Sequence, residues 1–231
     1  MLIKMKSYIK TFLFLNFNFI IIKNKNKFCG IQDLNNIDSF LDVGANIGAF
    51  IPKIVKFCNL NVRQAILIEP DPRMNSKLRK LKSPKINYCN YEPVCLSNKI
   101  GNVTFQSFEN GAVNSLLKAS DDFGPATEIE VMCTTGDKIV EKYSLDAGSI
   151  NLLKIDVQGV EVQVLEGFEK SLNFFKYVIC EISFKSFYEN QSEFLDILKI
   201  LNTTHLYVGN LSEVYNSNGK LDYMNAVFVR R

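Results

Sequence analysis

The sequence predicts an α/β fold: a mostly parallel sheet with helices on both faces and a C-terminal antiparallel pair of strands. From Ser39 onward, short apolar segments alternate with amphipathic ones, as strands and covering helices do in such sheets. The last two apolar segments, 204–211 and 225–231, are expected to form the antiparallel pair. The chain has 231 residues and is 47% apolar, which is enough for one domain with a full core.

The first expected elements are two strands, each followed by a helix. The first strand begins at Ser39, and the helix after it should start near Gly48, because Pro52 fits a helix only near its first turn. The second strand covers 64–70. Asp71 is then placed to cap the next helix, with a proline at the first helical position.

The rest of the chain continues this alternation. Segment 149–156 is apolar enough to be a central buried strand. Segment 110–127 is expected to be a loop because it contains several glycine and proline breakers. One domain is expected at 39–231, with 1–38 set apart as an N-terminal segment that is apolar and basic. The other expected strands are 85–89, 93–97, 103–108, 128–135 and 177–184, and the other expected helices are 160–172 and 192–201.

Residues 1–28 combine lysines with an apolar run, 11–22, that is shorter than the ~20 residues needed to span a bilayer. No small-residue cleavage site follows the run, which argues against a cleaved signal peptide. Three interpretations stay open: an element packed on the domain, weak membrane association through an interfacial or signal-like segment, and a poorly ordered tail. The expected location is cytoplasmic, with membrane association as the alternative.

The composition disfavours several kinds of partner. The net charge is only +3 and the Lys and Arg residues are spread along the chain, so no nucleic-acid partner is expected. No metal site is expected either, because the cysteines form no CxxC pair and His205 is the single histidine. The cysteines are expected to be buried free thiols of a reducing compartment.

The segment Ser39–Phe50, SFLDVGANIGAF, predicts a ligand-binding loop at the end of the first strand. Gly44 and Gly48 allow a tight turn and a close approach, Asp42 supplies a carboxylate, and Asn46 supplies an amide. The second strand ends at Glu69, which is placed to accept hydrogen bonds from both hydroxyls of a ribose. Ligands of open α/β sheets bind at this edge.

The spacing of the loop distinguishes two cofactor classes. A dinucleotide fold uses G-x-G-x-x-G, whereas the glycines here are Gly44 and Gly48, with a carboxylate at Asp42. A negative charge beside the loop disfavours a pyrophosphate and suits the cationic S-adenosyl-L-methionine. The alternatives that stay open are an NAD-type Rossmann oxidoreductase and a catalytically silent nucleoside-binding module.

The motifs FLDVGANIGAF, LIEPDPRMNSKL, TTGDKI, LLKIDVQGVEVQVLEGF and VICEISF resemble the FkbM-type family of S-adenosylmethionine-dependent methyltransferases. The resemblance implies a Rossmann-like class I methyltransferase fold. It also implies O-methylation of a hydroxyl on a small molecule, sugar or glycan. By motif match, it implies that Glu69 binds the ribose and that Cys95 and Leu96 lie near the adenine. The methionine end would be lined by Asp42, Gly44, Ala45, Asn46 and Gly48.

The catalytic residues are predicted at the ends of later strands. Asp156 ends the expected central strand and is the first candidate for the base, and Glu161 in the next helix could line the same crevice. Lys154 points to the same side as Asp156 and needs a partner, either Asp156 or Glu181. The family's usual D-x-E-G is altered here, because Gln158 takes the place of a glutamate.

Two further expectations concern the surroundings of the site. His205 is expected to be structural, since it lies far in sequence from the motifs. Segments 110–127 and 183–191 place aromatic residues beside polar ones and are expected to form an acceptor-binding lid, with ordinary surface loops as the alternative.

Overall fold

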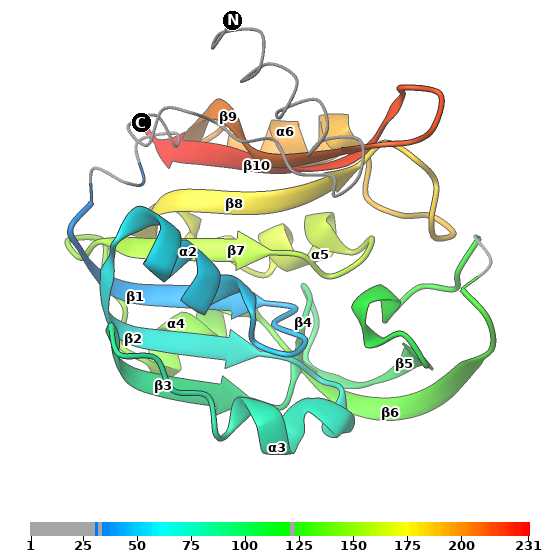
Figure 1. Ribbon diagram of the computed structural model, residues 1–231, viewed down its shortest axis with the longest axis horizontal. Coiled ribbons are helices and arrows are strands. Elements are labelled where there is room, and N and C mark those ends of the chain that lie inside the picture. Colours follow the sequence, from blue (N-terminus) through cyan, green and yellow to red (C-terminus); the bar gives the residue numbers. More distant parts are fainter. Residues whose placement is uncertain (1–30, 32–33, 121–122) are drawn as a thin grey trace, which may run out of the picture.

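A computed structural model describes residues 31, 34–120 and 123–231, and its centre is a seven-stranded sheet with the order β3-β2-β1-β7-β8-β10-β9 (Figure 1). The first five of these strands in that order are parallel, and β10 is antiparallel to both β8 and β9. The predicted fold class is therefore confirmed. The strands are β1 (Asn36–Val43), β2 (Asn61–Ile68), β3 (Ile86–Glu92), β7 (Asn151–Ile155), β8 (Phe175–Ser183), β9 (His205–Tyr215) and β10 (Leu221–Arg230).

A second, three-stranded sheet stands beside the first, and the sequence did not predict it. It contains β4 (Cys95–Leu96), β5 (Gly101–Phe108) and β6 (Ala126–Thr134) in the order β4-β6-β5. Most of β6 is exposed, and only its last part is buried. A strand with this burial pattern suits an edge layer, because a central parallel strand is covered on both faces.

The helices cover both faces of the large sheet. Helix α2 (Phe50–Cys58) lies on one face, and its third residue is Pro52, as predicted. Helices α4 (Gly136–Lys142), α5 (Glu161–Glu166) and α6 (Phe194–Leu201) lie on the other face (Figure 1). Helix α4 is not predicted from its sequence, and α5 is much shorter than the predicted 160–172.

The predicted cap at Asp71 is confirmed, although the helix that it begins is short. Asp71 Oδ1 accepts a hydrogen bond from Arg73 N at 2.9 Å. The 3₁₀ turn η2 (Pro72–Met74) follows and continues as the four-residue helix α3 (Asn75–Leu78). Two further 3₁₀ turns are η3 (Gly111–Val113) and η4 (Leu172–Phe174).

The core consists of one apolar layer on each face of the large sheet. Phe40 and Leu152 contribute to the layer under α2, while Leu41 and Leu153 contribute to the layer under α5 and α6. Side chains of a strand alternate between the faces, so Asp42 and Lys154 point toward the α2 side. The N-terminal segment 1–28, with its three open interpretations, lies outside the described residues.

Candidate active site

A cleft opens at the carboxyl ends of the parallel strands, beside the neighbouring strands β1 and β7. The strands that follow β1 in the chain lie on one side of this pair, and the strand that follows β7 lies on the other side. Strand order reverses at this point, which is where ligands bind in open α/β sheets. The space between its lining side chains, open solvent included, is about 660 Å³. It is lined by Val43, Gly44, Asn46, Ile68, Glu69, Pro70, Val94, Cys95, Leu96, Phe105, Gly111, Ala112, Asn114, Leu116, Asp156, Val157, Gln158 and Val160.

The structure brings six of the ten predicted site residues to this cleft. These six are Gly44, Asn46, Glu69, Cys95, Leu96 and Asp156. The other four, which lie behind the cleft wall, are Asp42, Ala45, Gly48 and Glu161. The six residues that line the cleft can contact a ligand directly, whereas the other four support the protein around it.

The two glycines of the first loop are required by protein contacts. Gly44 has φ +77°, and a Cβ on it would lie 1.8 Å from the carbonyl oxygen of Asp156. Gly48 has φ +72°, and a Cβ there would meet the side chains of Leu78 and Leu81. A side chain at Gly44 would push the loop away from the end of β7, and a side chain at Gly48 would push it away from α3. The two glycines therefore allow the loop to pack against both elements.

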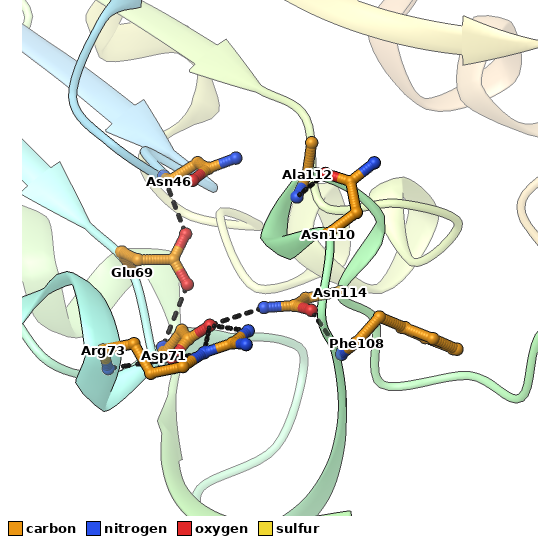
Figure 2. A network of polar contacts seen from close by, with 8 residues as sticks. All are labelled: Asn46, Glu69, Asp71, Arg73, Phe108, Asn110, Ala112 and Asn114. Atoms are coloured by element: carbon orange, nitrogen blue, oxygen red, sulfur yellow. Dashed lines mark hydrogen bonds and ion pairs between the residues drawn. The ribbon is translucent and has the colours of Figure 1, made fainter. Parts of the chain in front are cut away.

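Glu69 lines the cleft, and Figure 2 shows its carboxylate between Asn46 and Asp71. Its Oε2 accepts from Asn46 N at 2.8 Å and its Oε1 accepts from Asp71 N at 2.9 Å. Burial raises the pKa of Glu69 to about 7, although these two backbone hydrogen bonds act in the opposite direction. Each oxygen keeps a second acceptor position for a ligand hydroxyl.

Asp42, Lys154 and Asp156 form a buried network beside the cleft. Lys154 Nζ lies 3.1 Å from Asp42 Oδ1, 3.2 Å from Asp156 Oδ2 and 3.1 Å from the carbonyl oxygen of Gly44. Burial would lower the pKa of Lys154, but the carboxylates of Asp156 and Asp42 raise it above its usual value. The predicted partnership of Lys154 with Asp156 is confirmed.

Asp42 therefore stands in a different place from the one that the motif suggests. Its side chain is fully buried, whereas the Asp156 side chain is 27% exposed and lines the cleft. Asp42 does not line the cleft, and it contacts Lys154, which in turn contacts Asp156. The Asp42 carboxylate balances the charge of the buried Lys154 ammonium group.

Glu161 supports the loop that follows β7. Its Oε1 accepts from Val157 N at 3.2 Å and from Gly159 N at 3.1 Å. Burial raises the pKa of this carboxyl to about 7. Two backbone donors of a tight loop thus receive a buried acceptor, which holds Val157 and Gln158 against the cleft.

The wall opposite the large sheet comes from segments that are distant in the sequence. Asn114 Nδ2 donates to Asp71 Oδ2 at 2.7 Å, and its Oδ1 accepts from Phe108 N at 2.8 Å (Figure 2). This connection ties η3 to the loop after β2. The sequence predicts that segment 110–127 lies at the site, but no local signal distinguishes Asn114 and Leu116 as the residues that line the cleft.

The two segments predicted as a lid lie side by side. Ser120 N donates to the carbonyl oxygen of Phe187 at 2.9 Å, and Glu189 N donates to that of Lys118 at 2.9 Å. Phe123 stacks on Phe187 with ring centroids 6.3 Å apart. Aromatic packing and backbone pairing thus join segments that are far apart in the chain.

Other predicted residues and sites lie away from the cleft. His205 is fully buried, its Nε2 donates to the carbonyl oxygen of Phe175 at 2.9 Å, and its Nδ1 contacts the Thr204 hydroxyl, in agreement with a structural role. Among the described residues, no cluster of three or more His, Cys, Asp or Glu side chains is arranged to hold a metal ion. In the same part of the chain, every helix is too short or too polar to cross a membrane.

Comparison with known proteins agrees with this fold. Residues 42–210 match the family described as the Methyltransferase FkbM domain. The methyltransferase FkbM from Methylobacillus flagellatus KT is 14% identical with a TM-score of 0.51, over 84% of this chain and 43% of that chain. This chain thus spans less than half of that protein, and the likeness shows the shared fold. No curated protein sequence matches this chain.

Two more distant solved structures are also similar. M. capricolum TrmK in complex with S-adenosyl-homocysteine is 11% identical with a TM-score of 0.44, over 90% of this chain and 67% of that chain. A TehB-like methyltransferase from Corynebacterium glutamicum is 10% identical with a TM-score of 0.41, over 98% and 97%.

The strand order and the position of the cleft are those of a Rossmann-like class I methyltransferase. Since the family match covers well over half of its residues, the chain belongs to the FkbM family of S-adenosylmethionine-dependent methyltransferases. The cofactor of this family is S-adenosylmethionine, as predicted, and the NAD-type alternative is excluded by the same match. The charges of the cleft fit this cofactor, because its described lining contains the carboxylates Glu69 and Asp156 and no Lys or Arg.

Proposed function

We propose that this chain transfers the methyl group of S-adenosylmethionine to a hydroxyl oxygen of a small molecule, sugar or glycan. The proposal rests on the composition of one cleft, which contains the glycine loop and two carboxylates. Glu69 can accept hydrogen bonds from ribose hydroxyls, and Asp156 follows the end of a central strand. A hydroxyl acceptor must lose a proton when its oxygen gains the methyl group. A carboxylate at the edge of the cleft can take that proton.

The cofactor would lie along the ends of β1, β2 and β4. Gly44 and Asn46 are placed for its methionine end, and Glu69 can accept from the ribose hydroxyls. Cys95 and Leu96, both buried, supply an apolar surface for the adenine. When bound, the cofactor supplies an electrophilic methyl group.

Asp156 is the proposed base. Its Oδ2 lies 3.2 Å from Lys154 Nζ, and this ion pair keeps the carboxylate in place. The Asp156 side chain remains partly exposed to the cleft, so it can reach an acceptor hydroxyl. Glu161 is proposed as the support of the neighbouring loop, without a direct part in proton transfer.

The acceptor would enter beside the paired segments 110–127 and 183–191. Phe187 and Tyr188 lie on the second of these segments, close to Phe123. Rings and polar groups side by side suit an acceptor that carries both apolar faces and hydroxyls. We therefore place the acceptor end of the cleft between Asp156 and these rings.

The first test is calorimetric titration with S-adenosylmethionine, with NAD as the control, followed by methyl-transfer assays on hydroxylated small molecules and sugars. Micromolar binding of S-adenosylmethionine alone and methylation of an acceptor oxygen are expected. The variant Asp156→Asn should bind the cofactor normally and lose about 100-fold or more in kcat, because it cannot accept the proton. Unchanged kcat in this variant would remove Asp156 from the mechanism, and methylation of a nitrogen or carbon would contradict the proposed acceptor class.

A further inference from the structure

Gln158 lies where two cleft-side carboxylates meet. Its Nε2 is 2.7 Å from Asp156 Oδ1 and 2.9 Å from Glu181 Oε1. The amide nitrogen carries two hydrogens, and each is directed to one carboxylate. The Tyr188 hydroxyl lies 3.2 Å from the amide oxygen and 2.8 Å from the carbonyl oxygen of Val113, so the two oxygens share its one hydrogen. The opposite orientation of the amide would place its oxygen against two carboxylates, so the contacts determine which way it points.

The backbone of Gln158 is held by contacts that do not involve its side chain. Its carbonyl oxygen accepts from Ser115 Oγ at 2.6 Å, and the next carbonyl, that of Gly159, accepts from Ser192 N at 2.7 Å. Gln158 has φ +59°, a left-handed conformation that a residue other than glycine adopts at some cost. Such strain persists where the surrounding contacts enforce it, often beside a functional site.

The groups that face this position are mostly acidic. Asp156 pairs with Lys154, which is shared with Asp42 on β1, while Glu161 on α5 is buried nearby. Burial and the neighbouring carboxylates of Asp156 and Glu161 raise the pKa of Glu181 to about 9. Burial, together with Glu181 and Asp156, also raises the pKa of two phenols, those of Tyr188 and of Tyr223 on β10. An uncharged donor is the group that can join Asp156 to Glu181 without adding another negative charge.

We propose that Gln158 is a positioning residue, whose amide holds the carboxyl groups of Asp156 and Glu181 together and directs Asp156 toward the acceptor oxygen. The inference rests on the proposed methyl transfer for its catalytic meaning. The coupling of the two carboxylates through Gln158 is a separate property of the protein. It can be measured without an acceptor.

The test follows the carboxyl groups by ¹³C NMR in protein labelled at the Asp and Glu side-chain carboxyl carbons, with Asp156→Asn and Glu181→Gln to assign the signals. In Gln158→Met, which keeps the shape and removes both donors, the titration of Glu181 should move to higher pH by about one unit, because the hydrogen bond from Gln158 lowers the pKa of that carboxyl. In Gln158→Glu it should move further, because a third acid joins the two carboxyl groups. Gln64→Met is the matched control and should leave it unchanged, since Gln64 contacts Ser39 Oγ early in β2.

Kinetics with an acceptor of the wild-type protein provide the second measurement. Gln158→Met should lower kcat about tenfold or more and leave the Kd for S-adenosylmethionine within about twofold. In a plot of kcat against pH, the acid limb should move to higher pH. An unchanged titration of Glu181, or a loss of cofactor affinity equal to the loss of kcat, would overturn the proposal. A wild-type protein that methylates no acceptor would instead contradict the proposed function, while the NMR titration would still decide the role of Gln158.

Discussion

Lys154 Nζ donates a hydrogen bond to the carbonyl oxygen of Gly44 and forms ion pairs with Asp42 and Asp156. These contacts explain how an ammonium group can occupy a strand that is otherwise apolar. The ion pair with Lys154 also explains why the segment SFLDVGANIGAF contains Asp42. Asp42 is the buried counter-charge, while Asp156 shares the same lysine and remains open to the cleft.

Removing Asp42 should therefore affect stability more directly than cofactor binding. In Asp42→Ala, Lys154 keeps one carboxylate and loses the buried one, so the free energy of unfolding should fall by about 3–5 kcal/mol. Urea denaturation measures this change. Asp196→Ala is the control, because its exposed pair with Lys199 should contribute less than about 1 kcal/mol. Unchanged stability together with a loss of S-adenosylmethionine binding would instead indicate that Asp42 contacts the cofactor.

At the scale of the elements, the cleft depends on a contact between η3 and the turn that begins α3. Asp71 accepts from Arg73, from Arg73 N and from Asn114, so one carboxylate serves as helix cap and loop anchor together (Figure 2). Those hydrogen bonds lower the pKa of Asp71, although burial acts in the opposite direction. The anchor keeps Gly111 and Ala112 against the cleft.

The variant Asn114→Asp tests this anchor with almost no change of shape. The new carboxylate can still accept from Phe108 N but is repelled by Asp71, so η3 should separate from the turn. We expect faster amide hydrogen exchange in residues 109–116 and about tenfold weaker binding of S-adenosylmethionine. Asn61→Asp, at an exposed strand start, is the control. Unaltered exchange and affinity would mean that the wall is held by other contacts.

At the scale of the whole molecule, cofactor binding and stability are linked through Glu69. S-adenosylmethionine at about 100 times its Kd should stabilise the protein by about 2.7 kcal/mol, which corresponds to a rise in Tm of about 5–10 °C at pH 8. Glu69, whose pKa is raised to about 7, must be ionised to accept from the ribose hydroxyls. Below pH 7 the free protein holds that proton, so affinity should decrease about tenfold between pH 8 and pH 6.

Differential scanning fluorimetry and calorimetry at pH 6, 7 and 8 measure this linkage. Glu69→Gln should bind more weakly at pH 8 and should lose most of the pH dependence. An affinity that is independent of pH in the wild type would show that Glu69 is not titrating in the free cleft. A rise in affinity toward pH 6 would contradict the assigned direction.

Much of the architecture could be predicted from the sequence, because it depends on local periodicity. The alternation of strands and helices, the central buried strand and the antiparallel end follow from which residues are apolar and how they are spaced. Gly44, Glu69 and Asp156 follow from the same reasoning, since the ends of parallel strands meet at one edge. The motifs also indicated the family that the comparison confirms.

Only the tertiary structure decided which of these residues face the cleft. Asp42 and Lys154 are register partners in neighbouring strands, so Asp42 is used internally, a relation that no local pattern contains. Asn114 and Leu116 reach the cleft because the small sheet carries their loop across the edge of the large one. Gln158 acquires its role from Asp156, Glu181 and Tyr188, which come from three different segments. Strand ends are determined by local pattern, whereas side-chain partners depend on which segments the fold makes adjacent.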